Sequence, residues 1–482
     1  MSRTLTTHAS VLSLFFAAAA VSAVGCLGDG SSDDPNAEGQ SSAICTSANP
    51  WAEMVAYKVG DVVTYQGKAY KCIQAHTSLA GWTPAAVPAL WTETGTACTG
   101  SGASTSASTS ASTSTSSTTG AGGAGGAGGG STTSTSTTTT GAGGSTGTGG
   151  APTSSFAPHA LVGYWHNFTN PSGCTMPISQ VSSDWDVIVV AFADNDPSSS
   201  GTVKFTPFAG GGGCPAITPA QFKADVAAKR AQGKIVALSL GGADGTITLN
   251  TASDEANFVS SLTNIIKTWG FDGVDIDLES GSGLVHGSQI QTRLVTAIKQ
   301  LNTNVGGNMY LSMAPEHPYV QGGVVAFSSI WGAYLPIIDG LRNELDLLHV
   351  QLYNNSSVPT PNTPEYQNGK TFPEGTVDNL VVSATMLIEG FTTASGWKFQ
   401  GLPASKVAFG LPSGKSSSNS PVTSDATIEA AYTCIAKKVN CGQHVPAFAS
   451  PTFRGVMTWS INWDKFDGYP FSKPLGPFLH QQ

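Results

Sequence analysis

Three acidic residues alternate with aliphatic residues within Phe271–Ser280, which reads Phe-Asp-Gly-Val-Asp-Ile-Asp-Leu-Glu-Ser. Because successive side chains of a β-strand point to opposite faces, Asp275, Asp277 and Glu279 are expected to share one face. Crowded carboxylates disfavour joint ionisation, so at least one of them should hold a proton near neutral pH. A carboxylic acid that keeps its proton can act as a general acid towards a leaving group.

Two other interpretations of this stretch compete with an acid catalytic site. A solvated edge strand would also carry acids, but Val274, Ile276 and Leu278 on the opposite face favour an interior strand. A calcium loop needs a glycine and polar residues between its ligands, whereas the spacers here are aliphatic. The pattern therefore favours catalysis, with metal and surface interpretations as the alternatives.

The acidic strand belongs to a long region, residues 156–482, in which apolar runs recur. Near-continuous apolar runs separated by helical stretches predict a parallel sheet closed on itself, an α/β fold of the (β/α)8 TIM-barrel type. The expected strands are Leu161–Trp165, Val187–Ala193, Lys234–Gly242, Gly273–Glu279, Met309–Glu316, Leu345–Asn354, Val407–Pro412 and Gly455–Trp463. The clearest helical spacers are Pro219–Gln232, Ser253–Trp269, Ser288–Asn302, Thr376–Thr393 and Asp425–Lys438.

In such barrels the catalytic residues lie at the carboxyl ends of the strands. Tyr164 and Phe192 end the first and second expected strands, and Ser239-Leu240-Gly241-Gly242 ends the third. The fifth ends in Met313-Ala314-Pro315-Glu316, the sixth in Gln351-Leu352-Tyr353-Asn354-Asn355 and the eighth in Trp459-Ser460-Ile461-Asn462-Trp463. Each residue alone would be core or rim, but their joint placement at strand ends makes them candidates for the site.

The acidic run resembles the D-G-x-D-x-D-x-E signature of glycoside hydrolase family 18, the chitinases, and the resemblance extends over nearly all of this region. It implies Glu279 as the acid/base, Asp277 as the partner that orients the substrate's acetamido group, and Asp275 as a deeper carboxylate that modulates Asp277. It implies Tyr353 as donor to the acetamido carbonyl, and Trp459 as the ring under the sugar at the cleavage point. The remaining implied substrate contacts are Tyr164, Phe192, Gly242, Met313, Glu316, Gln351 and Asn354. A cis peptide bond between Trp459 and Ser460 is a further hypothesis, and no metal or other cofactor is expected.

The family's chemistry implies hydrolysis of β-1,4-linked N-acetylglucosamine with retention, in which the substrate's own acetamido oxygen attacks the anomeric carbon. The spacer from Ser413 to Arg454 is too short for the extra α+β domain that some members carry, so we expect a shallow groove and endo-type cleavage. Two alternatives remain: a chitin-binding lectin built on an inactive barrel, and an endoglycosidase that acts on N-glycans.

A small all-β module is predicted at residues 44–98, where aromatic residues are dense. Gly60–Cys72 reads as two short strands joined by a Gln-Gly turn. The segment resembles the carbohydrate-binding family 5/12 through its spacing of aromatic residues, glycines and Gly81-Trp82-Thr83-Pro84. The resemblance implies chitin binding with Trp82 as the exposed ring, while Trp51 and Trp91 are expected in the core.

The remaining segments are expected to lack a core. Residues 99–155 are almost entirely Ser, Thr, Gly and Ala, which predicts a flexible linker with a reach on the order of 40 Å. Residues 26–43 are polar and acidic, which predicts a disordered tether.

Residues 1–25 read as a secretory signal with a weakly basic start and an apolar run too short for a transmembrane helix. Ala23-Val24-Gly25-Cys26 resembles a lipoprotein cleavage box with Cys26 as the lipidated residue, and cleavage after Ala23 is the alternative. The protein is therefore expected outside the cell, either free or as a cell-surface lipoprotein.

Charge and cysteine content narrow the partners. The formal net charge is −9 and no Lys/Arg cluster is present, which excludes nucleic acid as an expected partner and is compatible with a neutral polysaccharide. Eight cysteines fit an oxidising compartment. The expected pairs are Cys45–Cys98, Cys174–Cys214 and Cys434–Cys441, which leaves Cys26 for the lipid and Cys72 as a thiol. A monomer is expected.

Overall fold

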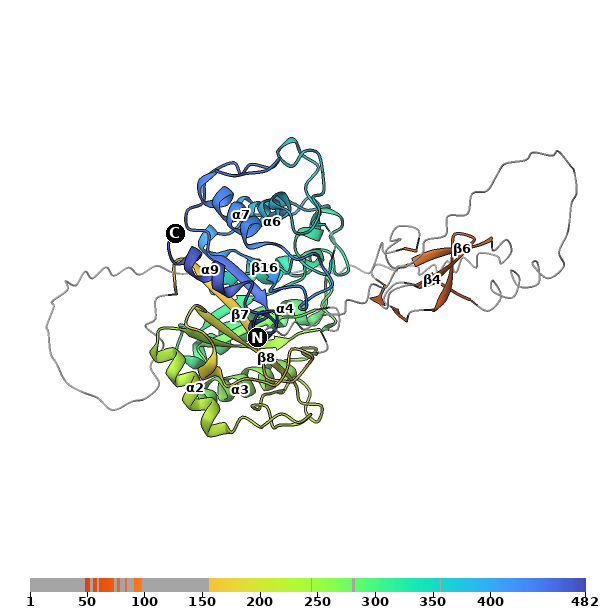
Figure 1. The fold of residues 1–482 in the computed structure, drawn as a ribbon. Coiled ribbons are helices and arrows are strands. Elements are labelled where there is room, and N and C mark those ends of the chain that lie inside the picture. The colour runs from red at the N-terminus through yellow and green to blue at the C-terminus, as the bar shows by residue number, and fades with distance from the viewer. Residues whose placement is uncertain are drawn as a thin grey trace, which may run out of the picture. The chain divides into compact units, whose positions relative to one another are not determined.

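The computed structural model describes residues 48–482 except 53–54, 59, 73–75, 79–82, 85–90, 98–155, 244, 280–281 and 356. The predicted signal, tether and linker, together with Cys26, Cys45, Cys98 and Trp82, lie outside the described residues. The chain divides into an N-terminal and a C-terminal unit, and each is described by itself (Figure 1).

The N-terminal unit is a small β-structure. Its main sheet has the order β1-β3-β4-β6, formed by Asn49–Pro50, Val62–Tyr65, Lys68–Cys72 and Trp91–Ala97. β2 (Ala56–Tyr57) pairs with β5 (His76–Thr77). The predicted hairpin is confirmed: β3 and β4 are antiparallel, and Gln66 and Gly67 between them have φ values of 47° and 74°. Positive φ at both central positions suits a tight two-residue hairpin turn.

Aromatic rings fill the core of this unit, as expected because a domain of this small size can bury little apolar surface. Trp91 is 2% exposed and meets Tyr57 edge to face at 4.9 Å between ring centroids. Trp51 is only partly buried and packs on the core edge to face with Tyr65. Cys72 is fully buried among these side chains.

The C-terminal unit contains the predicted barrel. Its sheet has the parallel order β13-β12-β11-β10-β8-β7-β17-β16, and the short β9 (Val203–Lys204) pairs antiparallel with β8. Parallel bridges from Leu348 to Val407 and from Gln351 to Gly410 join the two outermost strands and close the ring. The strands are β7 Ala160–His166, β8 Val187–Asn195, β10 Ile235–Gly241, β11 Gly273–Asp277, β12 Tyr310–Met313, β13 Leu347–Leu348, β16 Ala408–Pro412 and β17 Gly455–Trp459.

Several expected strands end earlier than the apolar pattern suggested. β11 stops at Asp277, β13 at Leu348 and β17 at Trp459, where α8 (Ile461–Phe466) follows almost at once. Beyond these points only isolated bridges continue the pairing among the described residues, such as those of Gln351 with Glu316 and with Gly410. Other backbone groups there find side-chain partners, such as the Leu278 N–H, which donates to the Tyr334 hydroxyl at 2.8 Å.

Helices surround the barrel, with α2 and α3 on one side of the strands and α6 and α7 on the opposite side (Figure 1). The predicted helices are confirmed within a few residues, with one exception. The helix expected at Thr376–Thr393 ends at Glu389, and its last expected residues belong to the hairpin β14–β15 (Phe391–Thr392, Lys398–Phe399). The main helices are α2 Pro219–Ala231, α3 Ala252–Trp269, α4 Gln289–Val305, α6 Val377–Glu389, α7 Asp425–Lys437 and α9 Ser472–Leu479. A shorter helix, α5, spans Leu335–Gly340.

Local chemistry determines where the acidic strand begins. α3 starts with a capping box at Thr251 and Asp254 and ends at Gly270, whose φ is 78°. Two residues later, Asp272 accepts from the backbone N–H of Val236 on the adjacent β10 at 2.8 Å. A Cβ on Gly273 would lie 1.9 Å from the Tyr310 carbonyl oxygen, so only glycine allows β11 and β12 to approach here.

Candidate active site

The acidic row lies at the carboxyl end of the barrel interior, with Asp275 as its deepest member. Asp275 is fully buried and accepts hydrogen bonds from three hydroxyl groups. Oδ2 accepts from Tyr164 at 2.6 Å and from Ser239 at 2.7 Å, and Oδ1 accepts from Ser312 at 2.7 Å. These donors come from β7, β10 and β12, so the barrel closes around this carboxylate.

Gln351 joins the two outer acids. Its Nε2 lies 3.0 Å from Asp277 Oδ1, from Glu279 Oε1 and from the Ala314 carbonyl oxygen. A side-chain amide has only two N–H donors, so three acceptors share them. The amide thereby holds Asp277 and Glu279 side by side without supplying a positive charge.

Burial and mutual repulsion act together on these carboxyl groups. Burial, then the charges of Glu279, Asp275 and Glu316, raise the pKa of Asp277 well above its usual range. Burial and the charge of Glu279 raise the pKa of Glu316 to about 7. Burial also raises the pKa of the Tyr353 hydroxyl, so Tyr353 remains a neutral donor. The cluster consequently retains a transferable proton near neutral pH.

A cavity of about 610 Å³ opens directly above this row. Asp277, Glu279 and Tyr353 line it, together with six more of the residues singled out from the sequence. These six are Tyr164, Phe192, Glu316, Gln351, Asn354 and Trp459. Residues from six different strand ends, far apart in the chain, therefore meet in one sugar-sized space.

Two of the expected substrate contacts, Gly242 and Met313, are not among the residues that line the cavity. Met313 is fully buried, and since Ser312 points into the barrel, strand alternation turns Met313 to the opposite face. Gly242 acts indirectly: its N–H donates to the Asp277 carbonyl oxygen at 2.7 Å. A Cβ there would lie 2.7 Å from the Phe192 ring, so the glycine makes room for that ring.

Three aromatic rings of similar orientation border the cavity. The planes of Phe192 and Trp459 differ by 15°, with 5.8 Å between centroids. Phe168 is parallel to Phe192 within 12° and to Trp459 within 26°. The expected cis peptide bond at Trp459–Ser460 is present, and a second occurs at Ala191–Phe192. Similarly oriented rings suit the apolar face of a sugar.

Some lining residues were not anticipated from the sequence: Asn167, Phe168, Asp194, Gly245 and Ser417. Asn167 and Phe168 follow the first strand, so extending the strand-end argument by two or three residues would have included them. Ser417 comes from the loop after β16, where neighbouring Ser420 accepts from the Asn354 N–H at 2.5 Å. No local pattern marks that serine.

Two of the expected disulfides are confirmed, Cys174–Cys214 and Cys434–Cys441. The first joins the loop that follows Phe168 to the glycine-rich loop at Gly210–Gly213. Asn167 links the same two loops, because its side chain donates to the Thr206 carbonyl oxygen and accepts from the Phe208 N–H, each at 2.8 Å. The disulfide therefore supports one wall of the cavity.

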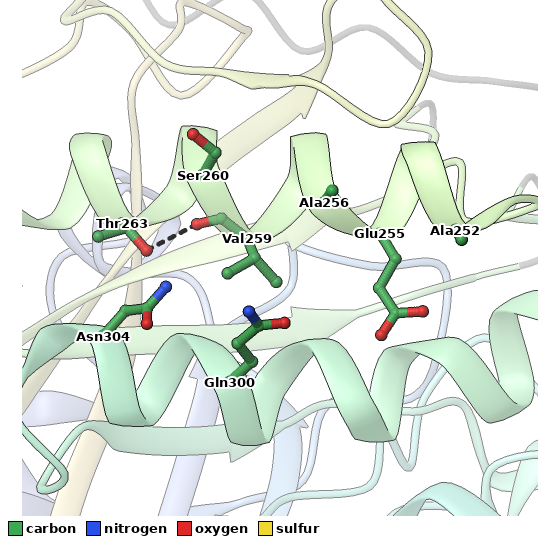
Figure 2. A pocket seen from close by; sticks show the side chains of 8 residues that line it. All are labelled: Ala252, Glu255, Ala256, Val259, Ser260, Thr263, Gln300 and Asn304. Atoms are coloured by element: carbon green, nitrogen blue, oxygen red, sulfur yellow. Dashed lines mark hydrogen bonds between the residues drawn. The ribbon is translucent and has the colours of Figure 1, made fainter.

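A second hollow, of about 440 Å³, lies between α3 and α4 (Figure 2). Glu255 is the one ionisable side chain in its lining, and it already pairs with Arg293 at 3.0 Å. Thr263 is occupied as well, since its hydroxyl donates to the Val259 carbonyl oxygen at 2.6 Å. This groove lacks converging reactive groups, so the cavity above the acidic row is the candidate site.

No group of three or more metal-ligating side chains occurs within the part of the chain that the structure describes. Among the same residues, no helix combines the length and apolar character needed to cross a bilayer.

Residues 160–473 match the family model described as Glycosyl hydrolases family 18, and residues 50–92 match Carbohydrate-binding module family 5/12. Chitinase Chi52 of Paenibacillus xylanexedens is 37% identical over 496 residues, covering 90% of this chain and 92% of that protein. Chitinase D of Niallia circulans is 35% identical over 497 residues with the same coverage, 90% and 92%. The crystal structure of a family GH18 chitinase from Chromobacterium violaceum is similar with a TM-score of 0.64 at 46% identity, covering 90% of this chain and 100% of that one.

Proposed function

Because the chain belongs to family 18 of the glycosyl hydrolases, we propose that it hydrolyses the β-1,4 linkages of chitin with retention at the anomeric carbon. One observation carries this proposal: Asp277 and Glu279, bridged by Gln351, form the base of a cavity that Tyr353 and Trp459 also line. The names of the relatives, which describe them as chitinases, support the choice of substrate.

In the first step, Glu279 gives its proton to the glycosidic oxygen while the bond from that oxygen to the anomeric carbon breaks. The acetamido oxygen of the same sugar attacks the anomeric carbon, so no second protein carboxylate acts as nucleophile. The result is an oxazolinium-like intermediate and a released sugar hydroxyl. Glu279 is suited to this step because it lines the cavity beside the proton-retaining Asp277.

Asp277 and Tyr353 hold the acetamido group during this step. Tyr353 keeps its hydroxyl proton because burial raises its pKa, and it donates to the acetamido oxygen. Asp277 accepts from the acetamido N–H and stabilises the positive charge that develops there. In the second step Glu279, now a carboxylate, removes a proton from water. The water oxygen bonds to the anomeric carbon from the face that the leaving group left, while the bond from that carbon to the acetamido oxygen breaks and the acetamido group is restored.

The short connection between β16 and β17 supports endo-type cleavage. Residues 413–454 hold α7 and the Cys434–Cys441 disulfide, and they contain no further sheet. Without an added wall in this segment, a long polysaccharide can lie across the cavity rather than thread into it from one end. Accumulation of dimer alone from the first minutes on insoluble chitin would contradict endo cleavage.

The N-terminal module is proposed to bind chitin and to raise the effective concentration of the catalytic domain at the polymer surface through the linker. Trp82 is its proposed binding ring. Export through the segment 1–25, with or without a lipid on Cys26, follows from the sequence pattern. Mass spectrometry of the mature N-terminus distinguishes a diacylglyceryl cysteine at Cys26 from a free terminus after Ala23.

The deciding experiment compares products from two substrates by mass spectrometry: N-acetylglucosamine oligomers and a high-mannose glycopeptide. Cleavage of the oligomers only supports chitin hydrolysis, and cleavage of the glycopeptide only would make the protein an endoglycosidase. Binding without cleavage of either would make it a lectin. Proton NMR of fresh products tests retention, since a β-anomer must appear before mutarotation if the mechanism is correct.

A further inference from the structure

A second row of side chains faces the acidic row across the barrel interior. His349, Gln351 and Tyr353 alternate along the chain after β13 (Leu347–Leu348), so they share one face in the way that the three acids do. Gln351 binds the two outer acids. One level deeper, His349 Nε2 lies 3.5 Å from Asp275 Oδ1. The proposed mechanism involves Gln351 and Tyr353 of this row, but it assigns no role to His349.

His349 is an unusual side chain for this position. It is 0% exposed, and neither ring nitrogen has a hydrogen-bond partner among the described residues. A buried polar group without a hydrogen-bond partner destabilises the fold, and an aliphatic side chain such as that of Leu347 would avoid this loss. The presence of an unpaired imidazole at this position therefore calls for a functional explanation.

The surroundings determine what the imidazole can do. Burial lowers the pKa of His349, so the ring is neutral, with one N–H donor and one acceptor nitrogen. Asp275 of β11 is the charged group beside it, and Tyr164 of β7 meets it edge to face with 6.2 Å between centroids. Tyr164 donates to Oδ2 of Asp275, whereas the imidazole of His349 lies nearest the other oxygen, Oδ1, of the same carboxylate.

The hydrogen bonds to Asp275 are distributed unequally between its two oxygens. Oδ2 accepts from two hydroxyl groups, whereas Oδ1 accepts from Ser312 alone. The open acceptor position is therefore on the oxygen nearest His349. A movement of about half an ångström would bring Nε2 to the 2.7–3.2 Å range of a hydrogen bond.

We propose that His349 is a positioning residue for the hydrolysis, whose Nε2–H completes the donors around Asp275 and fixes the position of that carboxylate. The charge of Asp275 is one of the causes that raise the pKa of Asp277, so the position of the Asp275 carboxylate affects how the outer acids of the row hold their proton. His349 neither gives up a proton nor touches the sugar. This inference depends on the proposed function, because it concerns the same acidic row.

The test compares two substitutions of His349 with a matched control. His349→Gln keeps an amide N–H donor near the position of Nε2, and His349→Phe keeps a planar ring without a donor. His444→Phe is the control, since His444 is 3% exposed and also has an unpartnered Nε2, but it lies in the loop after α7 and does not line the cavity. The kcat and KM on N-acetylglucosamine oligomers are measured from pH 4 to 9 for each variant and for Glu279→Gln.

We expect His349→Phe to lower kcat at least tenfold with KM unchanged within twofold, and to shift the pH profile of kcat. The profile shifts because an Asp275 carboxylate that is held less firmly no longer acts on the pKa of Asp277 in the same way. His349→Gln should retain at least a third of wild-type kcat, and His444→Phe should match wild type. Wild-type kinetics in His349→Phe, or equal losses in both variants with an unshifted profile, would overturn the proposal.

A second measurement determines the tautomer of His349 in the wild-type protein, so it does not depend on whether a variant folds. Long-range ¹H–¹⁵N correlation spectra of histidine-labelled protein should show His349 as the neutral Nε2–H tautomer from pH 5 to 8. The Nδ1–H tautomer or an imidazolium would overturn the inference. Failure of the proposed function is a separate result, since it would appear as no hydrolysis by wild type or as unchanged hydrolysis by Glu279→Gln.

Discussion

Buried carboxylates occur at both ends of the same barrel, and their neighbours differ completely. At the amino end, Asp272 pairs with Arg230 at 2.7 Å, and Asp186 pairs with Lys234 at 3.0 Å. At the carboxyl end, Asp277 has Glu279, Asp275 and Glu316 as its charged neighbours. Asp272 and Asp277 belong to one short run of sequence, so position along the strand decides the difference.

The amino-end acids repeat one structural device. Asp186, Asp272 and Asp346 each stand immediately before a strand, and each accepts from the backbone N–H of the second residue of the preceding strand in the sheet. The donors are Leu161 at 2.9 Å, Val236 at 2.8 Å and Leu311 at 2.9 Å. These carboxylates tie the starts of neighbouring strands together, so their role is structural.

The carboxyl-end acids are held in the opposite way. Neutral groups hold them, the hydroxyls at Asp275 and the amide of Gln351, and no Lys or Arg lies among the residues that line the cavity. Burial raises the pKa of both Asp272 and Asp277, but Arg230 opposes the rise at Asp272 whereas other carboxylates increase it at Asp277. The neighbours of the amino-end acids therefore stabilise the fold, whereas the neighbours of the carboxyl-end acids favour retention of a proton.

The largest expected effect is on catalysis at the carboxyl end. Glu279→Gln removes the proton donor while keeping the shape, so kcat should fall by roughly 10²–10⁴-fold with little change in KM. Steady-state kinetics on N-acetylglucosamine oligomers measure this, and the melting temperature should stay within a few degrees. Unchanged kcat would remove Glu279 from the mechanism.

The next largest effect is on stability at the amino end. Arg230→Met leaves Asp272 buried without its cation, which should cost about 2–4 kcal/mol of unfolding free energy at pH 7. The loss should shrink towards pH 4, because a carboxyl group whose folded pKa is raised destabilises the fold only once it ionises. Urea unfolding at the two pH values measures both, and kcat per folded molecule should be unchanged. A loss that is independent of pH would contradict the ion-pair explanation.

A substitution at the carboxyl end should stabilise the protein instead. The pKa of Glu316 is raised to about 7, so the native state binds more protons than the unfolded state, and stability falls as pH rises from about 4.5 to 7. Glu316→Gln removes this decline. We expect a gain on the order of 2 kcal/mol at pH 8 and almost none at pH 4. Thermal unfolding at both pH values provides the measurement, and destabilisation at pH 8 would be the contrary result.

The smallest effect should come from an exposed partner at the amino end. His480 Nε2 lies 2.9 Å from Asp186 Oδ2, but its side chain is 38% exposed and Asp186 keeps Lys234. His480→Gln should therefore change the unfolding free energy by no more than about 0.5 kcal/mol. Urea unfolding of His480→Gln and of wild type measures this difference. A loss of unfolding free energy as large as that of Arg230→Met would show that the contact between His480 and Asp186 is essential to the amino end.

Much of the site was predictable because its signals are local. Strand alternation placed Asp275, Asp277 and Glu279 on one face, and strand ends identified Tyr353 and Trp459. The same alternation rule, carried back two residues from Gln351, would also have selected His349. Asp272 has the same residue type as two acids of the row, and only its position, out of phase with their alternation, separates it from them.

Local sequence patterns were enough to predict the order of strands and helices and the shared face of the three acids, since these depend on neighbours a few positions away. Other relations became visible only in the folded barrel: Gln351 bridges two acids, Met313 turns away from the cavity, Ser417 lines it and Asp272 pairs with Arg230. Those relations depend on barrel closure, which brings together groups separated by tens to hundreds of residues. No local pattern encodes the distance between them.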